Sequence, residues 1–166
     1  MCGCSISKNL PKGESLYTGA KVEIVADSSL GKNEIKKLQT TLEEYVKPLP
    51  NSKILGFPYK VWFYYLFGEP KKQKGLKSFF RKRFGEAPIL ASKSVTNANT
   101  KLLTNLLNNE GYFQSSASGE LIEKNRKATA IYKAIVMPRY YLDSINYTID
   151  SSVIGKAFYK AQNNTF

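Results

Sequence analysis

The chain carries a regular order of strand and helix patterns that one block of different composition interrupts. An alternating apolar pattern over residues 21–26 is followed by a helical pattern that ends before Pro48. After the block at about 51–90, a second helical pattern and then two strand patterns follow. The order β-α-insert-α-β-β predicts an α+β domain over residues 20–138, with a three-stranded sheet covered by helices.

Two helices are predicted from apolar residues that recur at intervals of three and four. Asn33 and Thr96 are candidate caps at their starts, and Gly111 fits the left-handed position after the second helix. Each helix has one apolar stripe, which should face the sheet. The stripes are Ile35, Leu38, Leu42, Tyr45 and Val46 in the first helix, and Leu102, Leu103, Leu106 and Leu107 in the second.

The strand predicted over residues 114–122 is small and polar, and a hairpin turn over residues 123–127 joins it to the next strand. Such a strand suits an edge of the sheet better than its centre. An edge exposes N–H and C=O groups that can add an extended peptide, a mode called β-augmentation. A protected, inert edge is the alternative. The residues assigned to a client-binding edge are Gln114, Ser116, Ser118, Glu120 and Ile122.

The block at 51–90 concentrates aromatic and basic side chains. About half of the aromatic residues lie between Phe57 and Phe84, and residues 53–84 hold nine basic residues against one acidic residue. The block predicts helices inserted between the two main helices, the second of them basic and amphipathic. Three interpretations are open: a core with a solvated basic face, a surface that docks on a membrane or a protein, and a nucleic-acid surface. The residues assigned to docking are Trp62, Lys74, Lys77, Arg81 and Lys82.

The composition restricts the chemistry open to this chain. It contains no histidine, which excludes histidine bases and most catalytic zinc sites. Its acidic residues show no paired spacing, so the sequence predicts no enzyme activity, no metal site and no cofactor. The net charge of +12 favours an anionic partner: a nucleic acid, a membrane surface or an acidic protein.

The first residues have two interpretations. Cys2, Gly3, Cys4 and Ser5 show the small-residue-then-cysteine pattern of a lipoprotein processing site. The alternative is an ordinary reduced cysteine pair at a frayed terminus. Pro11, Gly13 and Gly19 lie among polar residues, which predicts an extended lead-in over residues 1–19.

The end of the chain repeats its beginning. Residues 145–156 echo residues 22–32: an alternating strand, then Asp-Ser-Ser, an apolar residue and Gly-Lys. The echo predicts that residues 139–166 hold the first strand and part of the first helix of a second unit, which is cut short.

Several segments resemble one known group when they are taken in order. They are Cys4-Ser5, residues 10–22, residues 53–57, the Trp62 segment, residues 85–88 and residues 109–113. Together they resemble the N-terminal region of lipoprotein-type BamA/TamA-like outer-membrane proteins. The β-α-α-β-β order is similar to the polypeptide-transport-associated (POTRA) domain, whose Gly-Tyr-Phe junction corresponds to Gly111, Tyr112 and Phe113.

The resemblance implies a function in protein assembly or translocation. It implies a module on the periplasmic side of the outer membrane of a Gram-negative bacterium, preceding a C-terminal barrel that these residues do not include. The module would have no active site and would bind unfolded outer-membrane protein segments by β-augmentation, with no nucleic-acid partner. Acylated Cys4 and the basic face would attach it to outer-membrane lipid. The alternative is a basic domain that binds nucleic acid or an anionic membrane surface; phosphate contacts would then weaken steeply with salt.

Overall fold

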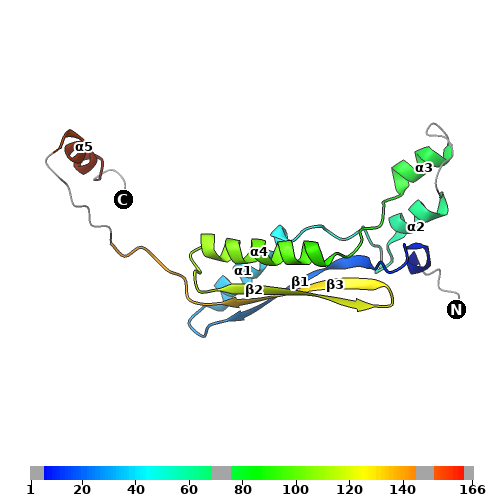
Figure 1. Cartoon of the computed structure of the whole chain (residues 1–166), viewed down its shortest axis with the longest axis horizontal. Helices are drawn as coiled ribbons and strands as arrows, with labels where there is room; N and C mark the ends of the chain where they lie inside the picture. The colour runs from blue at the N-terminus through cyan, green and yellow to red at the C-terminus, as the bar shows by residue number, and fades with distance from the viewer. Residues whose placement is uncertain (1–5, 69–75, 145–151, 163–166) are drawn as a thin grey trace.

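A three-stranded sheet with helices on one face forms the body of the molecule (Figure 1). The computed structural model describes residues 6–68, 76–144 and 152–162. Its elements confirm the predicted α+β class. In chain order they are η1 (Ile6–Asn9), β1 (Leu16–Ala26), α1 (Lys32–Tyr45), α2 (Tyr59–Leu66), α3 (Leu76–Phe84), α4 (Lys93–Asn109), β2 (Ser116–Lys124), β3 (Lys127–Val136) and α5 (Val153–Gln162).

The last strand in the sequence is the central strand of the sheet. The strand order is β1-β3-β2, with β1 parallel and β2 antiparallel to β3. Alternate residues of β3 face the helices and are buried, as its alternating pattern predicts. They are Ala128, Ala130, Tyr132, Ala134 and Val136. In the part of the chain that the structure describes, no helix covers the opposite face of the sheet (Figure 1).

The core lies between this sheet and the helices α1 and α4. Leu38 and Leu42 of α1 and Leu103 and Leu107 of α4 are buried together against the sheet. The central residues of each predicted stripe therefore face the sheet, as expected, whereas some flanking residues of the stripes are not buried. Leu106 is only partly buried, and Tyr45 and Leu102 are exposed.

Both predicted helix caps are wrong. Helix α4 begins at Lys93 after Ser92, whose hydroxyl accepts a hydrogen bond from the N–H of Val95 at 3.4 Å. Ser92 has the extended backbone that a cap requires, whereas Thr96 already lies in the first turn and is buried. Helix α1 begins after Gly31, and no side chain caps it.

The segment expected to be an extended lead-in is structured from Ile6 onward in the described residues. Ile6 and Leu10 are buried, and β1 begins at Leu16 instead of Lys21. A bulge between Tyr17 and Gly19 interrupts the register with β3, so the two parts of β1 do not alternate in one phase. Because of that shift, the alternating sequence pattern does not predict the first residues of the strand.

The insert is confirmed as helical and lies between α1 and α4. Its two ends are joined at Asn51, which is 2% exposed. The Asn51 amide donates to the Glu86 carboxylate and to the Ala87 carbonyl, both at 2.8 Å, and accepts from the N–H of Ile89 at 2.8 Å. Helices α2 and α3 project beyond this junction at the end of the molecule where η1 lies (Figure 1).

The chain after β3 is held against the loop that follows α4. The N–H of Tyr140 donates to the carbonyl of Gly111 at 2.9 Å, and the ring of Tyr140 packs on Phe113. Gly111 has φ +90°, as predicted, and a Cβ there would lie 3.1 Å from the Tyr140 carbonyl oxygen. The strand predicted for a second unit, at about 145–149, lies outside the described residues, and α5 follows it.

Candidate functional site

The hairpin turn fixes which backbone groups of β2 face away from the sheet. Only Asn125 and Arg126 separate β2 from β3, and both have positive φ, +54° and +59°. A two-residue turn of this kind places its flanking residues, Lys124 and Lys127, in a hydrogen-bonded pair. Such pairs alternate along an antiparallel ladder. Ser116, Ser118, Glu120 and Ile122 therefore hydrogen-bond to β3 through their main chains.

The residues between them direct their N–H and C=O groups away from β3. These are Ala117, Gly119, Leu121 and Glu123. The Ala117 N–H donates to the hydroxyl of Thr104 in α4 at 3.2 Å, which agrees with this register. Among the described residues, no hydrogen bond reaches the outward N–H groups of Gly119, Leu121 and Glu123. We call these three positions the open row.

Helix α4 lies along β2, next to the open row. It contacts β2 more extensively than it contacts β3. The approach is closest at Gly119, where a Cβ would lie 2.5 Å from the hydroxyl oxygen of Thr100 and 2.8 Å from the ring of Tyr132. Gly119 therefore permits the helix to pack closely on β2. Thr100 and Thr104, one turn apart, place hydroxyl groups on the side of α4 that meets the strand.

The other edge of the sheet, along β1, is occupied at its start. The Tyr17 N–H donates to the Ile89 carbonyl at 2.8 Å, and the Ala91 N–H donates to the Ser15 carbonyl at 2.9 Å. Further along, the side chain of Gln39 donates to the Val22 carbonyl at 2.9 Å. Lys53 donates to the Thr18 carbonyl, and burial lowers its pKa. Among the described residues, these contacts occupy main-chain groups at four positions of this edge, from Ser15 to Val22, whereas the one contact to an outward group of β2 is at Ala117.

The structure places the predicted client-binding residues on the uncovered face of the sheet. Ser116, Ser118, Glu120 and Ile122 are exposed, and Gln114 precedes β2, which begins at Ser116. Their side chains can contact a bound partner, but the main-chain groups free to pair with it belong to the open row. A hollow of about 350 Å³ on this face is lined by Glu23, Ser118, Gly119, Glu120, Ile131 and Lys133.

The docking residues assigned from sequence that the structure describes lie in the insert, away from β2. Trp62 is partly buried and packs edge-on against Phe63. Arg81 stacks on the ring of Tyr64, 3.9 Å from its centre, and donates to the Gly68 carbonyl at 2.7 Å. Lys82 is exposed. Lys77 belongs to α3, whereas Lys74 and Cys4 lie outside the described residues.

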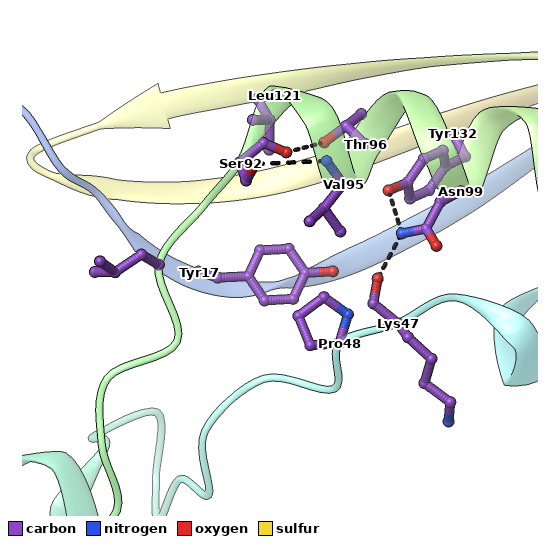
Figure 2. A pocket seen from close by; sticks show the side chains of 10 residues that line it. Tyr17, Lys47, Pro48, Ser92, Val95, Thr96, Asn99, Leu121 and Tyr132 are labelled. Carbon is purple, nitrogen blue, oxygen red and sulfur yellow. Dashed lines mark hydrogen bonds between the residues drawn. The ribbon is translucent and has the colours of Figure 1, made fainter.

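A small cavity of about 10 Å³ lies between α4 and the start of β1, which is space for about one water molecule. Figure 2 shows Asn99 there, donating to the Lys47 carbonyl and, at 2.9 Å, to the hydroxyl of Tyr132. Burial, and then the nearby Tyr132, raises the pKa of Tyr17 to about 12. These contacts are structural.

The described residues provide neither a cluster of metal-ligating side chains nor a membrane-spanning helix. Within residues 6–68, 76–144 and 152–162, no three Cys, Asp or Glu side chains gather in a way that could hold a metal ion. No helix in these ranges has the length and apolar character needed to cross a bilayer.

Two features of the insert and of the β2 edge cannot be predicted from the sequence. One is the Asn51 junction, because an asparagine directly after a proline is typical of any loop. The other is the open row, because its position depends on which two residues form the turn. Comparison of the chain with protein-family models, curated proteins and solved structures found no match.

Proposed function

We propose that this domain is a non-enzymatic module that binds extended segments of unfolded polypeptide chains. The bound segment adds to the sheet beside β2 and pairs with the open row at Gly119, Leu121 and Glu123. The observation that carries this proposal is the unpaired row itself, at the less occupied edge of the sheet. Main-chain pairing gives affinity that depends little on the partner's side chains, which suits a protein that handles many unfolded clients.

The local chemistry of β2 supports a tolerant site. Ser116, Ser118 and Gly119 present little bulk beside an incoming strand. The hydroxyl of Thr104 already pairs with the Ala117 N–H, so the added strand has free partners mainly from Gly119 toward the hairpin. A short ladder of this kind predicts weak, reversible binding.

The POTRA assignment belongs to the same proposal. The order of the sheet domain is β-α-α-β-β once the insert is set aside, as the resemblance expects. Gly111 in the Gly-Tyr-Phe junction has the left-handed backbone that favours glycine. The proposed setting is the periplasmic side of the outer membrane of a Gram-negative bacterium. The proposed clients are outer-membrane protein segments, and acylated Cys4 is the proposed membrane anchor.

Nucleic acid is not the partner that we propose. The aromatic rings of the insert stack mainly on one another: Phe63 on Phe67, and Phe80 on both Phe67 and Phe84. Rings that pack in this way are poorly placed to stack on bases.

Glu123 offers a matched pair of variants that tests the open row. Glu123→Pro removes the outward N–H, which an edge strand tolerates, whereas Glu123→Ala keeps it. Both variants lose the hydrogen bond that the Glu123 carboxylate accepts from Ser15 at 2.9 Å. We expect the proline variant to bind an unfolded outer-membrane protein segment at least about tenfold more weakly than the alanine variant, measured by fluorescence anisotropy.

The alanine variant should bind like the wild type. Circular dichroism and thermal unfolding of both variants establish that the sheet remains folded. If the folded proline variant binds as tightly as the alanine variant, pairing at this edge is excluded.

A further inference from the structure

The exposed side of α3 combines apolar and basic residues. At 100° per residue, Phe80, Phe84 and Arg81 lie on the side that packs against α2, where Phe80 stacks on Phe67 and Arg81 on Tyr64. The side turned away from α2 carries Leu76, Phe79, Lys82 and Arg83. Leu76 is 78% exposed and Phe79 is 60% exposed, and both cations are exposed.

This finding differs from the expected division into an apolar packed face and a basic solvated face. The rings of Phe80 and Phe84 fill the contact with α2. Among the described residues, the Phe79 ring meets only the edge of Phe80, at 5.6 Å between ring centres, and both Leu76 and Phe79 remain mostly exposed. We call Leu76, Phe79, Lys82 and Arg83 the α3 face. Neither Lys82 nor Arg83 has a hydrogen bond or an ion pair with another described residue.

The rest of the insert adds positive charge and apolar exposure. Its described parts, residues 51–68 and 76–90, hold four basic residues besides Lys82 and Arg83, against Glu86 alone. Asn51 and Ser52 hydrogen-bond to the Glu86 carboxylate. Leu66 of α2 is 56% exposed. Figure 1 shows α2 and α3 projecting from the sheet domain, so both helices are accessible from outside it.

We infer that the α3 face docks on an anionic lipid surface, with Leu76 and Phe79 entering the interface and Lys82 and Arg83 meeting the headgroups. Charge complementarity and shape select this partner. The face is one side of a short projecting helix, and a lipid interface accepts such a convex amphipathic surface without a matching groove. The cations beside it attract anionic headgroups.

The docking end of the molecule is also the end where the described chain begins. Helix α2 contacts η1, whose Ile6 is buried. The open row lies on β2 in the sheet domain, outside the insert. The inference is therefore independent of the proposed client binding, and a failure of either leaves the other standing.

Binding of the full chain, with an unmodified N-terminus, to vesicles tests the inference. We expect it to sediment with phosphatidylcholine vesicles that contain phosphatidylglycerol, and not with phosphatidylcholine alone. Raising the salt from about 50 mM to about 500 mM should weaken binding, because the Debye length shortens. Lys82→Glu with Arg83→Glu should weaken binding at least about tenfold, as should Leu76→Ser with Phe79→Ser.

The matched control is Lys36→Glu with Lys37→Glu on α1, where both lysines are exposed and the change in net charge is the same. This control should bind like the wild type. A second measurement places the face in the bilayer: Phe79→Trp, in a Trp62→Phe background, should be quenched by lipids with brominated acyl chains.

Three results would overturn the inference. The first is equal loss of binding in the control variant, which would show a general charge effect. The second is full binding by the Leu76 and Phe79 variant, or a Phe79→Trp variant that brominated lipids do not quench. The third is that the Leu76 and Phe79 changes abolish self-association of the protein in solution without affecting vesicle binding, which would assign the face to a second copy of the chain.

Discussion

Asn51 joins the two ends of the insert through three hydrogen bonds of 2.8 Å from one buried side chain. Arg126 has a similar role at the N-terminal segment, where its guanidinium donates to the carbonyls of Leu10, Pro11 and Glu14. Both residues satisfy backbone groups of irregular segments, which would otherwise be costly to bury. Neither role has a signature in local sequence, because the partners lie far away along the chain.

Tyr112 provides a prediction at this scale. Its hydroxyl donates to the Glu34 carboxylate at 2.8 Å, and burial, followed by this hydrogen bond, raises its pKa to about 12. The unfolded chain loses the tyrosine proton near pH 10, whereas the folded chain retains it to about pH 12. The stabilisation is therefore complete below pH 10 and is lost as the pH rises from 10 to 12.

Tyr112→Phe should make the fall in unfolding free energy between pH 10 and 12 shallower than in the wild type. At pH 7 the variant should be less stable by about 1 kcal/mol, because one hydrogen bond is lost. Urea unfolding at several pH values measures both effects, and Tyr45→Phe, at an exposed position, is the control. An alkaline slope identical to that of the wild type would contradict the assigned role of Tyr112.

At the scale of elements, periodicity predicts the middle of each helix and strand better than its ends. The sequence predicts β3 because its apolar and exposed residues alternate without interruption. The bulge at Gly19 breaks this alternation in β1, so the sequence pattern does not predict where β1 begins. The apolar stripe of α4 contains four leucines, and its sequence alone does not rank them. The structure ranks them: Leu103 and Leu107 are fully buried, Leu106 is partly buried and Leu102 is 38% exposed.

This ranking predicts the cost of truncating each leucine. Leu107→Ala should lower the unfolding free energy by about 2–5 kcal/mol, as expected for a fully buried leucine. Leu106→Ala should cost less, and Leu102→Ala should stay within about 1 kcal/mol of the wild type. Urea denaturation of the three variants measures the order. A greater loss at Leu106 than at Leu107 would show that α4 is rotated relative to its place in the structure.

At the scale of the whole molecule, the sequence predicts a sheet domain with a helical insert and a polar edge strand. It does not predict which groups of that strand are free. The predicted turn covered residues 123–127, and moving a two-residue turn by one position reverses the faces of the whole hairpin. The structure assigns the turn to Asn125 and Arg126, and that assignment turns the main-chain groups of Ser116 and Ser118 toward β3 and those of Ala117 and Gly119 away from it.

Amide hydrogen exchange along β2, followed by NMR, tests the central claim most directly. In the free protein, the N–H groups of Gly119, Leu121 and Glu123 should exchange quickly, while those of Ser118, Glu120 and Ile122 should be protected by β3. A saturating concentration of an extended peptide from an outer-membrane protein strand should then slow exchange in the open row by at least about tenfold. Unchanged exchange at these three positions with the peptide bound, or protection of β1 instead, would contradict strand addition at β2.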